Sequence, residues 1–322
     1  MSDDSAPRPR VSVAMITYQH ERFIAHAIES VLMQDAGFPY ELVIGDDAST
    51  DRTRDVVEDY RRRHPDRIRL LTADANQGVA RNFVKTLREC RGPYVALLEG
   101  DDYWTAPDKM RRQAEFLDAH PEHAACFHPV KIRADGEAGT RHVQRVRPPP
   151  GGFGLEHLLR ANFMHTCSVM SRNGLIPAWP EPFLDLKMLD WPYHILNALR
   201  GTVGFLPDAM AVYRLHAASA WSAGRLRDRI AETRRMLELV NAHLGGRHER
   251  VIRRSLAECD CQEAIQHGRE GHRRAARPLA ASCLRAYRAG NGPPLSALLA
   301  MGAVMAWPAL YRLVLAKKPL WR

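Results

Sequence analysis

Polar side chains end three apolar segments of the sequence, and most of them are carboxylates. The side chains at these ends are Thr17 and Tyr18, Asp46 and Asp47, and Glu99, Asp101 and Asp102. Carboxylates that lie side by side repel one another and raise one another's pKa unless a cation or a donor compensates. Because hard oxygen ligands suit these ions, the pattern predicts a bound divalent metal, Mg²⁺ or Mn²⁺. Ordinary loop polarity, with Asp as a cap residue, is the alternative; it explains Asp51 well and the EGDD run at 99–102 poorly.

Strands must bring these ends together. The segments with the apolar, β-branched character of buried strands are residues 11–18, 40–47, 68–71 and 94–98. They alternate with helical patterns that begin near residue 21, after residue 51 and at residue 79. This alternation predicts an α/β fold with a Rossmann-like, mostly parallel sheet flanked by helices. In such a sheet ligands bind at the carboxyl ends of the strands, where the strand order reverses.

The rest of the chain falls into an irregular middle and a helical end. The run PPPGG at 148–152 predicts a break near the site or at a subdomain boundary. The elements predicted in the middle are helices at 154–162 and 186–199 and strands at 167–170, 202–206 and 209–213. Beyond residue 225 the pattern is helical and Arg-rich, with a break at Gly245-Gly246. We therefore predict two domains, residues 1–224 with the acidic ends and a basic helical extension at 225–322.

The net charge of +9 is unevenly spread. Residues 225–322 hold 19 basic and 8 acidic residues, so they carry +11 and residues 1–224 carry −2. A basic extension indicates a polyanionic partner, either nucleic acid or anionic lipid, unless it is simply an Arg-rich solvated surface. Nucleic-acid binding is disfavoured, because residues 225–290 contain a single aromatic residue, Tyr287, and no recognised binding motif. We expect no nucleic-acid partner and an anionic membrane surface instead.

An uncharged stretch at 295–311 is close to the lower length limit for a membrane span. Pro308 interrupts it and basic residues follow it, so a helix at the membrane interface fits better than a span. Trp307, Tyr311 and Trp321 would be its interfacial anchors. The alternative is a helix that packs on the body of the protein.

Cysteine usage and the N-terminal residues bear on the compartment. The six scattered cysteines form no CxxC pair and no zinc spacing, so we expect buried free thiols in a reducing compartment. The N-terminal run MSDDSAPRPR lacks the apolar core of a signal peptide. These features predict a cytoplasmic protein, peripheral on the inner face of the plasma membrane.

Two common phosphate-binding motifs are missing from the sequence. No G-x-G-x-x-G follows the first strand and no G-x-x-x-x-G-K-[ST] occurs, which disfavours dinucleotide oxidoreductases and P-loop phosphotransferases. Four other motifs, in order, make residues 11–117 resemble the family 2 glycosyltransferases with the GT-A fold, of the bacterial surface-polysaccharide type. These are VSVAMITYQHERFIAHAIESVLMQ, ELVIGDDASTDRT, NQGVARNF and LLEGDDYWTAPDKM. A further match, DWPYHILNALRG at 190–201 continuing to YRLH at 213–216, brings the coverage to about two-thirds of the chain.

The resemblance implies a role for particular residues. Those that would bind the nucleotide are Thr17, Tyr18, Asp47, Asn76, Arg81 and Arg214. Those that would hold the metal on the diphosphate are Glu99, Asp101, Asp102 and His216. Glu99 stands where the family has Asp, and its longer side chain shifts it towards a ribose contact or an indirect one. Asp190 would be the general base, with Asp185 as its nearest rival.

The implied activity is an inverting, metal-dependent glycosyl transfer. The donor would be a nucleotide-diphosphate sugar and the acceptor a glycan or a lipid-linked glycan, in cell-surface polysaccharide or lipid-linked glycan synthesis. Residues 1–224 would then be the nucleotide-sugar-binding catalytic domain. Two alternatives remain, a non-catalytic relative that binds nucleotide sugar and a nucleotidyltransferase on a similar fold. The latter would normally carry a Gly-rich basic loop after its first strand, and TYQHER is not such a loop.

Overall fold

The structure, a computed structural model, describes residues 8–135, 139–140, 142–217, 219 and 224–306. The chain divides into two compact units. One comprises Met1–Leu158 and Asn162–Ala223, and the other comprises Leu159–Ala161 and Gly224–Arg322.

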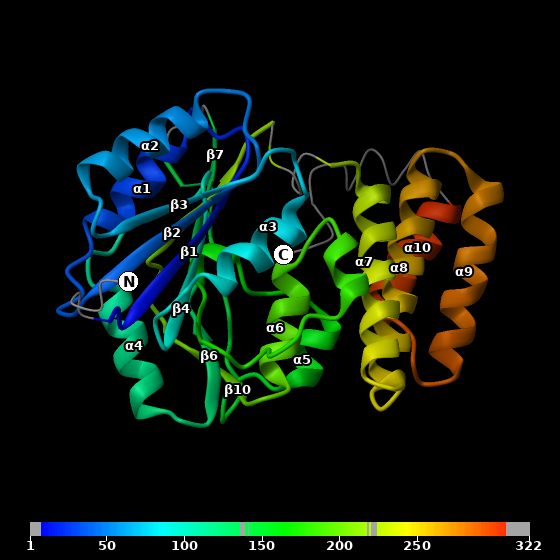
Figure 1. Ribbon diagram of the computed structural model, residues 1–322. Helices are drawn as coiled ribbons and strands as arrows, with labels where there is room; N and C mark the ends of the chain where they lie inside the picture. Colours follow the sequence, from blue (N-terminus) through cyan, green and yellow to red (C-terminus); the bar gives the residue numbers. More distant parts are fainter. Residues whose placement is uncertain (1–7, 136–138, 141, 218, 220–223, 307–322) are drawn as a thin grey trace. The chain divides into compact units, whose positions relative to one another are not determined.

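A seven-stranded sheet forms the centre of the first unit (Figure 1). In spatial order its strands are β10 (Thr202–Phe205), β6 (His123–Phe127), β9 (Met170–Arg172), β4 (Tyr94–Glu99), β1 (Val11–Thr17), β2 (Tyr40–Asp46) and β3 (Ile68–Thr72). Every neighbouring pair is parallel except the two pairs that β9 makes with β4 and β6. The predicted α/β fold with a mostly parallel sheet is therefore confirmed.

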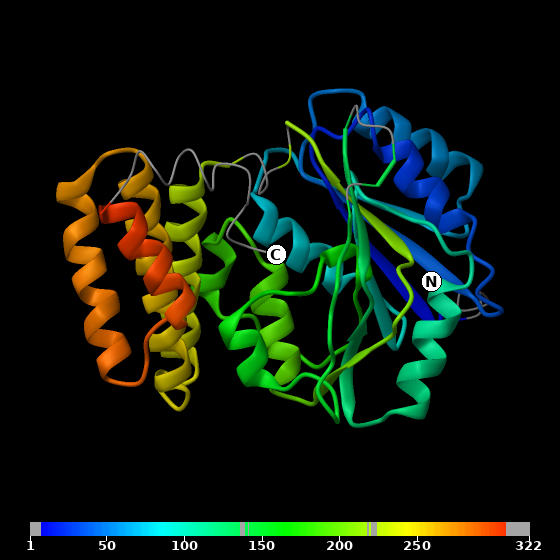
Figure 2. The ribbon, with the colours of Figure 1, turned by 180° about the vertical axis from the view of Figure 1, so that it is seen from behind.

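Helices cover both faces of this sheet. In chain order they are α1 (Ile24–Leu32), α2 (Thr53–Arg63), α3 (Val79–Arg88), α4 (Lys109–Ala119), α5 (Leu155–Arg160) and α6 (Asp190–Ala198). Figures 1 and 2 show α1 and α2 on one face and α3 on the other. Right-handed crossovers require this arrangement, because the chain steps from β1 to β2 and β3 and then returns across β1 to β4. Covered on both faces, β1 and β2 are buried at every residue, which explains their almost wholly apolar sequences.

A second, four-stranded sheet joins distant parts of the first unit. Its strands, in spatial order, are β5 (Tyr103–Trp104), β11 (Ala211–Leu215), β7 (Val130–Ala134) and β8 (His142–Val143). Residues Ala211 and Val212 pair with Trp104 and Tyr103, directly after the acidic run that follows β4. This pairing holds the YRLH segment beside the acids.

The strand predicted at 167–170 is wrong in position. A 3₁₀ turn (Thr166–Ser168) occupies the first half of this range, and β9 begins at Met170. The carbonyl of Thr166 accepts the backbone N–H of Val169, and the other two carbonyls of the turn bond to side chains instead of to a neighbouring strand. The carbonyl of Cys167 accepts from Trp104 Nε1 at 2.9 Å, and that of Ser168 accepts from Gln113 Nε2 at 2.9 Å.

The second unit is helical as far as residue 306. Its helices are α7 (Leu226–His243), α8 (Glu249–Arg269), α9 (Arg273–Arg288) and α10 (Leu295–Ala306). The break predicted at Gly245-Gly246 is confirmed, and both glycines have positive φ angles, of 60° and 71°. Helix α10 packs Leu298, Met301 and Val304 into the core of this unit.

Helix α10 bears directly on the prediction of a membrane-associated helix. Two of its leucines remain exposed, Leu295 at 56% and Leu299 at 66%. Among the described residues, no helix combines the length and the apolar character that crossing a bilayer would require. The predicted anchors Trp307, Tyr311 and Trp321 lie outside the described residues.

All six cysteines are buried and free of disulfides, as predicted. Three lie in the first unit and three in the second. These are Cys90, Cys126 and Cys167, and Cys259, Cys261 and Cys283.

Candidate active site

The carboxyl ends of β1 and β4 meet closely at one edge of the sheet. The N–H of Gly100 donates to the carbonyl of Ile16 at 2.9 Å. A Cβ atom at residue 100 would lie 2.6 Å from Oγ1 of Thr17 and 2.9 Å from Nδ1 of His20. Such distances exclude any side chain larger than that of glycine unless its neighbours shift. The Gly in the EGDD run therefore permits the loop after β4 to lie against Thr17 and His20.

Asp101 lies between two imidazoles. Its Oδ2 is 2.9 Å from Nε2 of His216 and 3.7 Å from Nε2 of His20. Burial acts to raise the pKa of Asp101, but the hydrogen bond with His216 and the nearby His20 outweigh it and lower the pKa. Asp101 is thus the carboxylate of this cluster that stays ionised most readily.

The pKa values of Asp102 and Glu99 shift in the opposite direction to that of Asp101. Asp102 is 1% exposed; its Oδ1 accepts the backbone N–H of Arg214 at 2.8 Å, while its buried Oδ2 has no partner among the described residues. Burial, followed by the charge of Asp101, raises the pKa of Asp102 well above its usual value. Burial and the charges of Asp101, Asp102 and Asp190 do the same to the pKa of Glu99. A cation placed among these side chains would favour their ionised forms.

The donor set fits a divalent metal that substrate oxygens complete. The unpaired Oδ2 of Asp102 is a buried acceptor without a donor, which a cation would satisfy. Asp101 and His216 supply the two side-chain atoms that lie closest together, and no three ligand atoms of the described cluster converge within 4.8 Å. Mg²⁺ typically binds one or two carboxylates together with substrate phosphates, and the carboxylates match that arrangement, whereas the imidazole of His216 suits a transition-metal ion such as Mn²⁺ better than Mg²⁺.

Two other described groups bring three ligand atoms together away from this edge. One consists of His120, Glu122 and His123, and the other of His267, Glu270 and His272. In the second group, Nη2 of Arg227 lies 2.9 Å from Nδ1 of His267 and already pairs with Glu270. Neither group lies on an element that carries the predicted site residues.

Asp190 begins α6 and lies near the acidic cluster. Its Oδ2 accepts a hydrogen bond from Nδ2 of Asn162 at 2.8 Å, and burial raises its pKa. Its charge contributes to the raised pKa of Glu99. Asp185, the alternative candidate for the base, is exposed, and its Oδ1 accepts from Nη2 of Arg81 at 2.9 Å.

The predicted nucleotide residues lie along the same sheet edge and on α3. Both carboxylate oxygens of Asp47 accept backbone N–H groups, from Gln77 at 2.8 Å and from Gly78 at 2.9 Å. Nδ2 of Asn76 donates to the Asp47 carbonyl at 3.2 Å, so Asp47 anchors the 76–78 turn beside β2. Tyr18 follows β1 and is 43% exposed. Arg81 is exposed on α3, where it pairs with Asp185.

Three residues that the sequence did not single out also belong to this region. They are His20, Phe23 and Tyr213. The Phe23 ring lies 4.5 Å from that of His216, and burial together with the charge of Asp102 raises the pKa of Tyr213. His20 could have been identified from the sequence, because it lies just after the end of a predicted strand, in TYQH. The other two contacts depend on the second sheet and have no local sequence signal.

Comparison with known proteins places this chain in a family. Residues 12–176 match the model of glycosyl transferase family 2. An uncharacterized protein of Mycobacterium tuberculosis is 38% identical over 246 residues, covering 72% of this chain and 69% of that protein.

Two solved structures share the fold. Staphylococcus aureus TarS 1–349 in complex with UDP-GlcNAc has a TM-score of 0.58 at 19% identity, covering 92% of this chain and 90% of that one. The mannosyltransferase PcManGT of Pyrobaculum calidifontis, in complex with GDP-Man and Mn²⁺, has a TM-score of 0.52 at 22% identity, covering 96% and 85%. These similarities confirm the predicted GT-A fold. The family model matches more than half of the length of the chain. The chain therefore belongs to glycosyl transferase family 2 and is a glycosyltransferase.

Proposed function

We propose that this enzyme is an inverting, metal-dependent glycosyltransferase that moves a sugar from a nucleotide-diphosphate sugar to an acceptor hydroxyl. The observation that carries the proposal is the buried acidic cluster at the carboxyl edge of the sheet, with Oδ2 of Asp102 left without a partner among the described residues. UDP-GlcNAc and GDP-Man in the two related structures, and Mn²⁺ in one, support the donor class and the metal.

The acceptor class follows from the relatives more than from the site. TarS is named as a poly(ribitol-phosphate) N-acetylglucosaminyltransferase, which supports a role in cell-surface polysaccharide or lipid-linked glycan synthesis.

The donor would lie across the ends of β1, β2 and β4. Thr17 and Tyr18 would line the nucleotide pocket, and Asp47 would hold the turn that presents Asn76 to the base. Arg81 on α3 and Arg214 on β11 would supply positive charge towards the phosphates. Arg81 would have to exchange Asp185 for the nucleotide, because the two side chains pair at 2.9 Å.

Asp101 and His216 would hold the metal, with Asp102 and Glu99 beside them. When bound, the metal would neutralise the charge that develops on the departing nucleoside diphosphate. Until the metal binds, Nε2 of His216 fixes the orientation of the Asp101 carboxylate, and the same nitrogen would then bind the metal, while the Arg214 N–H would fix the orientation of Asp102. Burial and the neighbouring acids raise the pKa of Glu99, and the metal would offset this and favour its ionised form close to Asp190.

Asp190 would act as the general base. Its hydrogen bond with Asn162 orients the carboxylate, and its raised pKa makes it a stronger base than an exposed Asp. It would remove the proton from the acceptor hydroxyl as that oxygen attacks the anomeric carbon. One base suffices for inversion, because no covalent glycosyl-enzyme intermediate forms.

An assay with UDP-, GDP- and dTDP-sugars, each with Mg²⁺, with Mn²⁺ and with excess chelator, tests this proposal. We expect hydrolysis or transfer from one class of donor, and only with metal. Full activity in excess chelator would contradict metal dependence. Release of pyrophosphate from a nucleoside triphosphate and a sugar phosphate would instead identify a nucleotidyltransferase.

The basic second unit is proposed to bind an anionic membrane surface from the inner side of the plasma membrane. Two observations support this proposal, the +11 charge of residues 225–322 and the exposure of Leu295 and Leu299 on α10. Co-sedimentation with vesicles of phosphatidylglycerol and phosphatidylcholine tests this. Leu295→Ser with Leu299→Ser should weaken binding, and equal binding to vesicles of phosphatidylcholine alone would count against an electrostatic contact.

A further inference from the structure

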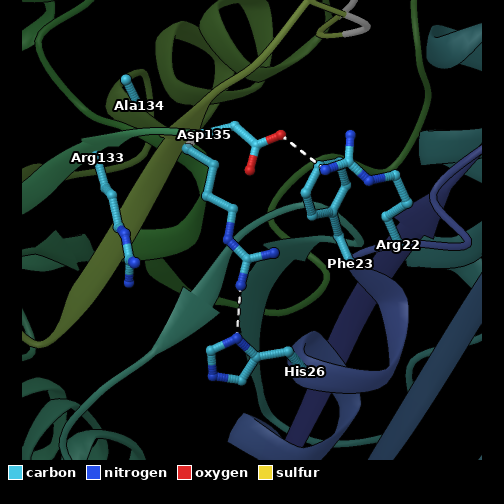
Figure 3. Close-up of a pocket in the computed structure, with 7 residues that line it drawn as sticks. Arg22, Phe23, His26, Arg133, Ala134 and Asp135 are labelled. Atoms are coloured by element: carbon cyan, nitrogen blue, oxygen red, sulfur yellow. Dashed lines mark hydrogen bonds and ion pairs between the residues drawn. The ribbon is translucent and has the colours of Figure 1, made fainter. Parts of the chain in front are cut away.

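A pocket of about 300 Å³ lies between α1 and the second sheet of the first unit (Figure 3). Its lining residues come from the start of α1, from the end of β7 and from β11, and they are Arg22, Phe23, His26, Arg133, Ala134, Asp135 and Arg214. Figure 3 shows Arg133 and Arg22 entering from opposite sides, with Asp135 paired to Arg22. Three guanidinium groups therefore face one cavity.

The positive charge of this pocket is only partly compensated. Arg22 pairs with Asp135 at 3.1 Å. Among the described residues, neither Arg133 nor Arg214 has a carboxylate within ion-pair distance; Nη1 of Arg133 lies 3.5 Å from the Tyr103 hydroxyl. The pocket thus carries a net charge of about +2, which favours a ligand with two negative charges.

Arg214 is held in place by neutral groups. Its Nη2 lies 2.5 Å from Nδ1 of His26, and its guanidinium lies 4.5 Å from the centre of the Tyr103 ring and 5.1 Å from that of Phe23. Burial, followed by the charge of Arg214, lowers the pKa of His26, so this imidazole stays neutral and accepts the hydrogen bond. These contacts position the planar guanidinium without neutralising it, as recognition of a phosphate requires.

The pocket adjoins the acidic cluster and shares Arg214 with the proposed nucleotide site, but it lies apart from Asp47 and Asn76. Phe23 is a shared wall, since its ring contacts His216 of the cluster as well as Arg214 of the pocket. The backbone N–H of Arg214 also donates to Asp102. In contrast, Asp47 and Asn76 follow β2 and β3, on the opposite side of β1 from β4 in the strand order. A ligand in this pocket would therefore approach the reacting groups from the side of the second sheet.

We propose that this pocket binds a phosphate group carried by the acceptor. This inference rests on the proposed function, because it identifies the substrate class of the same active site. The phosphate could belong to a repeat of a phosphate-containing polymer or to the head group of a lipid carrier, and the chemistry of recognition is the same. The volume of the pocket also leaves room for part of the acceptor unit that bears the phosphate.

Calorimetric titration of the full chain tests the proposal. The three ligands are inorganic phosphate, glycerol 3-phosphate and a bis-glycerol phosphodiester. Each titration contains Mg²⁺ and is run with and without saturating UDP. We expect binding that UDP does not displace. Arg133→Met should weaken it about tenfold or more, since a charge-assisted hydrogen bond is lost, and Arg133→Lys should restore part of it. Arg54→Ala, which removes one exposed arginine from α2, is the matched control and should bind phosphate as the unchanged chain does.

Vesicles that carry phosphatidic acid separate the two sources of phosphate. Binding of the soluble esters that depends on Arg133 identifies a polymer phosphate, and vesicle binding that depends on Arg133 identifies a lipid phosphate. Displacement by UDP would assign the ion to the donor diphosphate, and equal binding by Arg133→Met would mean an adventitious ion only; either overturns the inference. A chain that binds no UDP and cleaves no donor would refute the proposed function instead, whatever its affinity for phosphate.

Discussion

Nε2 of His216 lies 2.9 Å from Oδ2 of Asp101, although the two residues are 115 positions apart in the chain. Asp101 follows β4 of the main sheet, and His216 follows β11 of the second sheet. The His216 side chain is only 3% exposed, so it closes one side of the acidic cluster. The second sheet therefore contributes a side chain to the candidate active site and is not merely a support for it.

Replacement of His216 should mainly raise the metal concentration that activity requires. In His216→Ala the carboxylate of Asp101 loses its fixed orientation and the cluster loses a nitrogen donor. We expect the Mn²⁺ concentration for half-maximal activity to rise about 10- to 100-fold. A titration of activity against Mn²⁺ measures this, with His64→Ala, at the end of α2, as the matched variant. An unchanged metal requirement would remove His216 from the metal site.

Asp190→Asn should abolish transfer while leaving the donor bound. Loss of a general base typically costs about 10²- to 10⁴-fold in turnover, and the amide preserves the shape of the side chain. Turnover and nucleotide affinity are measured on the same preparation, and nucleotide affinity should stay within about twofold. Asp185→Asn, which alters an exposed partner of Arg81, provides the comparison. If Asp185→Asn abolishes turnover and Asp190→Asn does not, the base has been assigned to the wrong carboxylate.

Gly100→Ala should destabilise the first unit and disturb the acidic cluster. The added Cβ would meet Thr17 Oγ1 at 2.6 Å and His20 Nδ1 at 2.9 Å, which forces β1 and the loop after β4 apart. We expect a loss of about 1–3 kcal/mol in the free energy of unfolding, measured with urea, together with reduced activity. Gly154→Ala is a suitable comparison because its Cβ would meet nothing within 4 Å. Equal stability of the two variants would show that the contact at residue 100 is not tight.

The first unit should lose stability as the pH falls below about 6.5. Burial lowers the pKa of His194 to about 3, whereas an unfolded chain binds this proton near 6.5. Between these values the unfolded state binds more protons, so the free energy of unfolding decreases as the pH falls, by about 1.4 kcal/mol per unit for this group. His128, with a pKa also lowered to about 3 by burial, adds to the slope.

His194→Asn tests this pH dependence, because Asn keeps a short polar side chain but does not titrate. Urea denaturation at pH 7, 6 and 5 should give a shallower dependence on pH for this variant than for the unchanged chain. His64→Asn, at a partly exposed position, should retain the original slope. Identical slopes for all three proteins would mean that the pKa of His194 is the same in the folded and unfolded states, which contradicts the lowered pKa.

Part of the main sheet could be predicted from the sequence, because β1, β2 and β4 are buried along almost their whole length, whereas β6 was not predicted and β9 was misplaced. Such strands appear as continuous apolar runs, and the observed β1, β2, β3 and β4 differ from the predicted ranges by one residue at one end. The acids at their ends were found for the same reason, since they interrupt those runs abruptly.

The pairing of the second sheet could not be predicted in this way, although the strand predicted at 209–213 overlaps β11. Strands β5 and β8 are each two residues long, and β11 pairs with β5 and β7, which lie far away in the chain. Pairing between strands so far apart in the chain leaves no periodic pattern in the local sequence. For the same reason the contacts of Phe23, Tyr213 and Arg133 became visible only in the structure. His20 was adjacent to a strand end, yet its partner Asp101 is brought to it by the fold alone.

The buried cysteines provide a built-in probe of local opening. Each unit holds three free thiols, and burial raises the pKa of Cys90 and of Cys259 to about 12, so both are unreactive while the protein stays closed. An alkylating reagent therefore modifies them only when the surrounding structure opens. Mass spectrometry of the labelled peptides would give a separate opening rate for the first unit and for the second unit, from a chain without introduced cysteines.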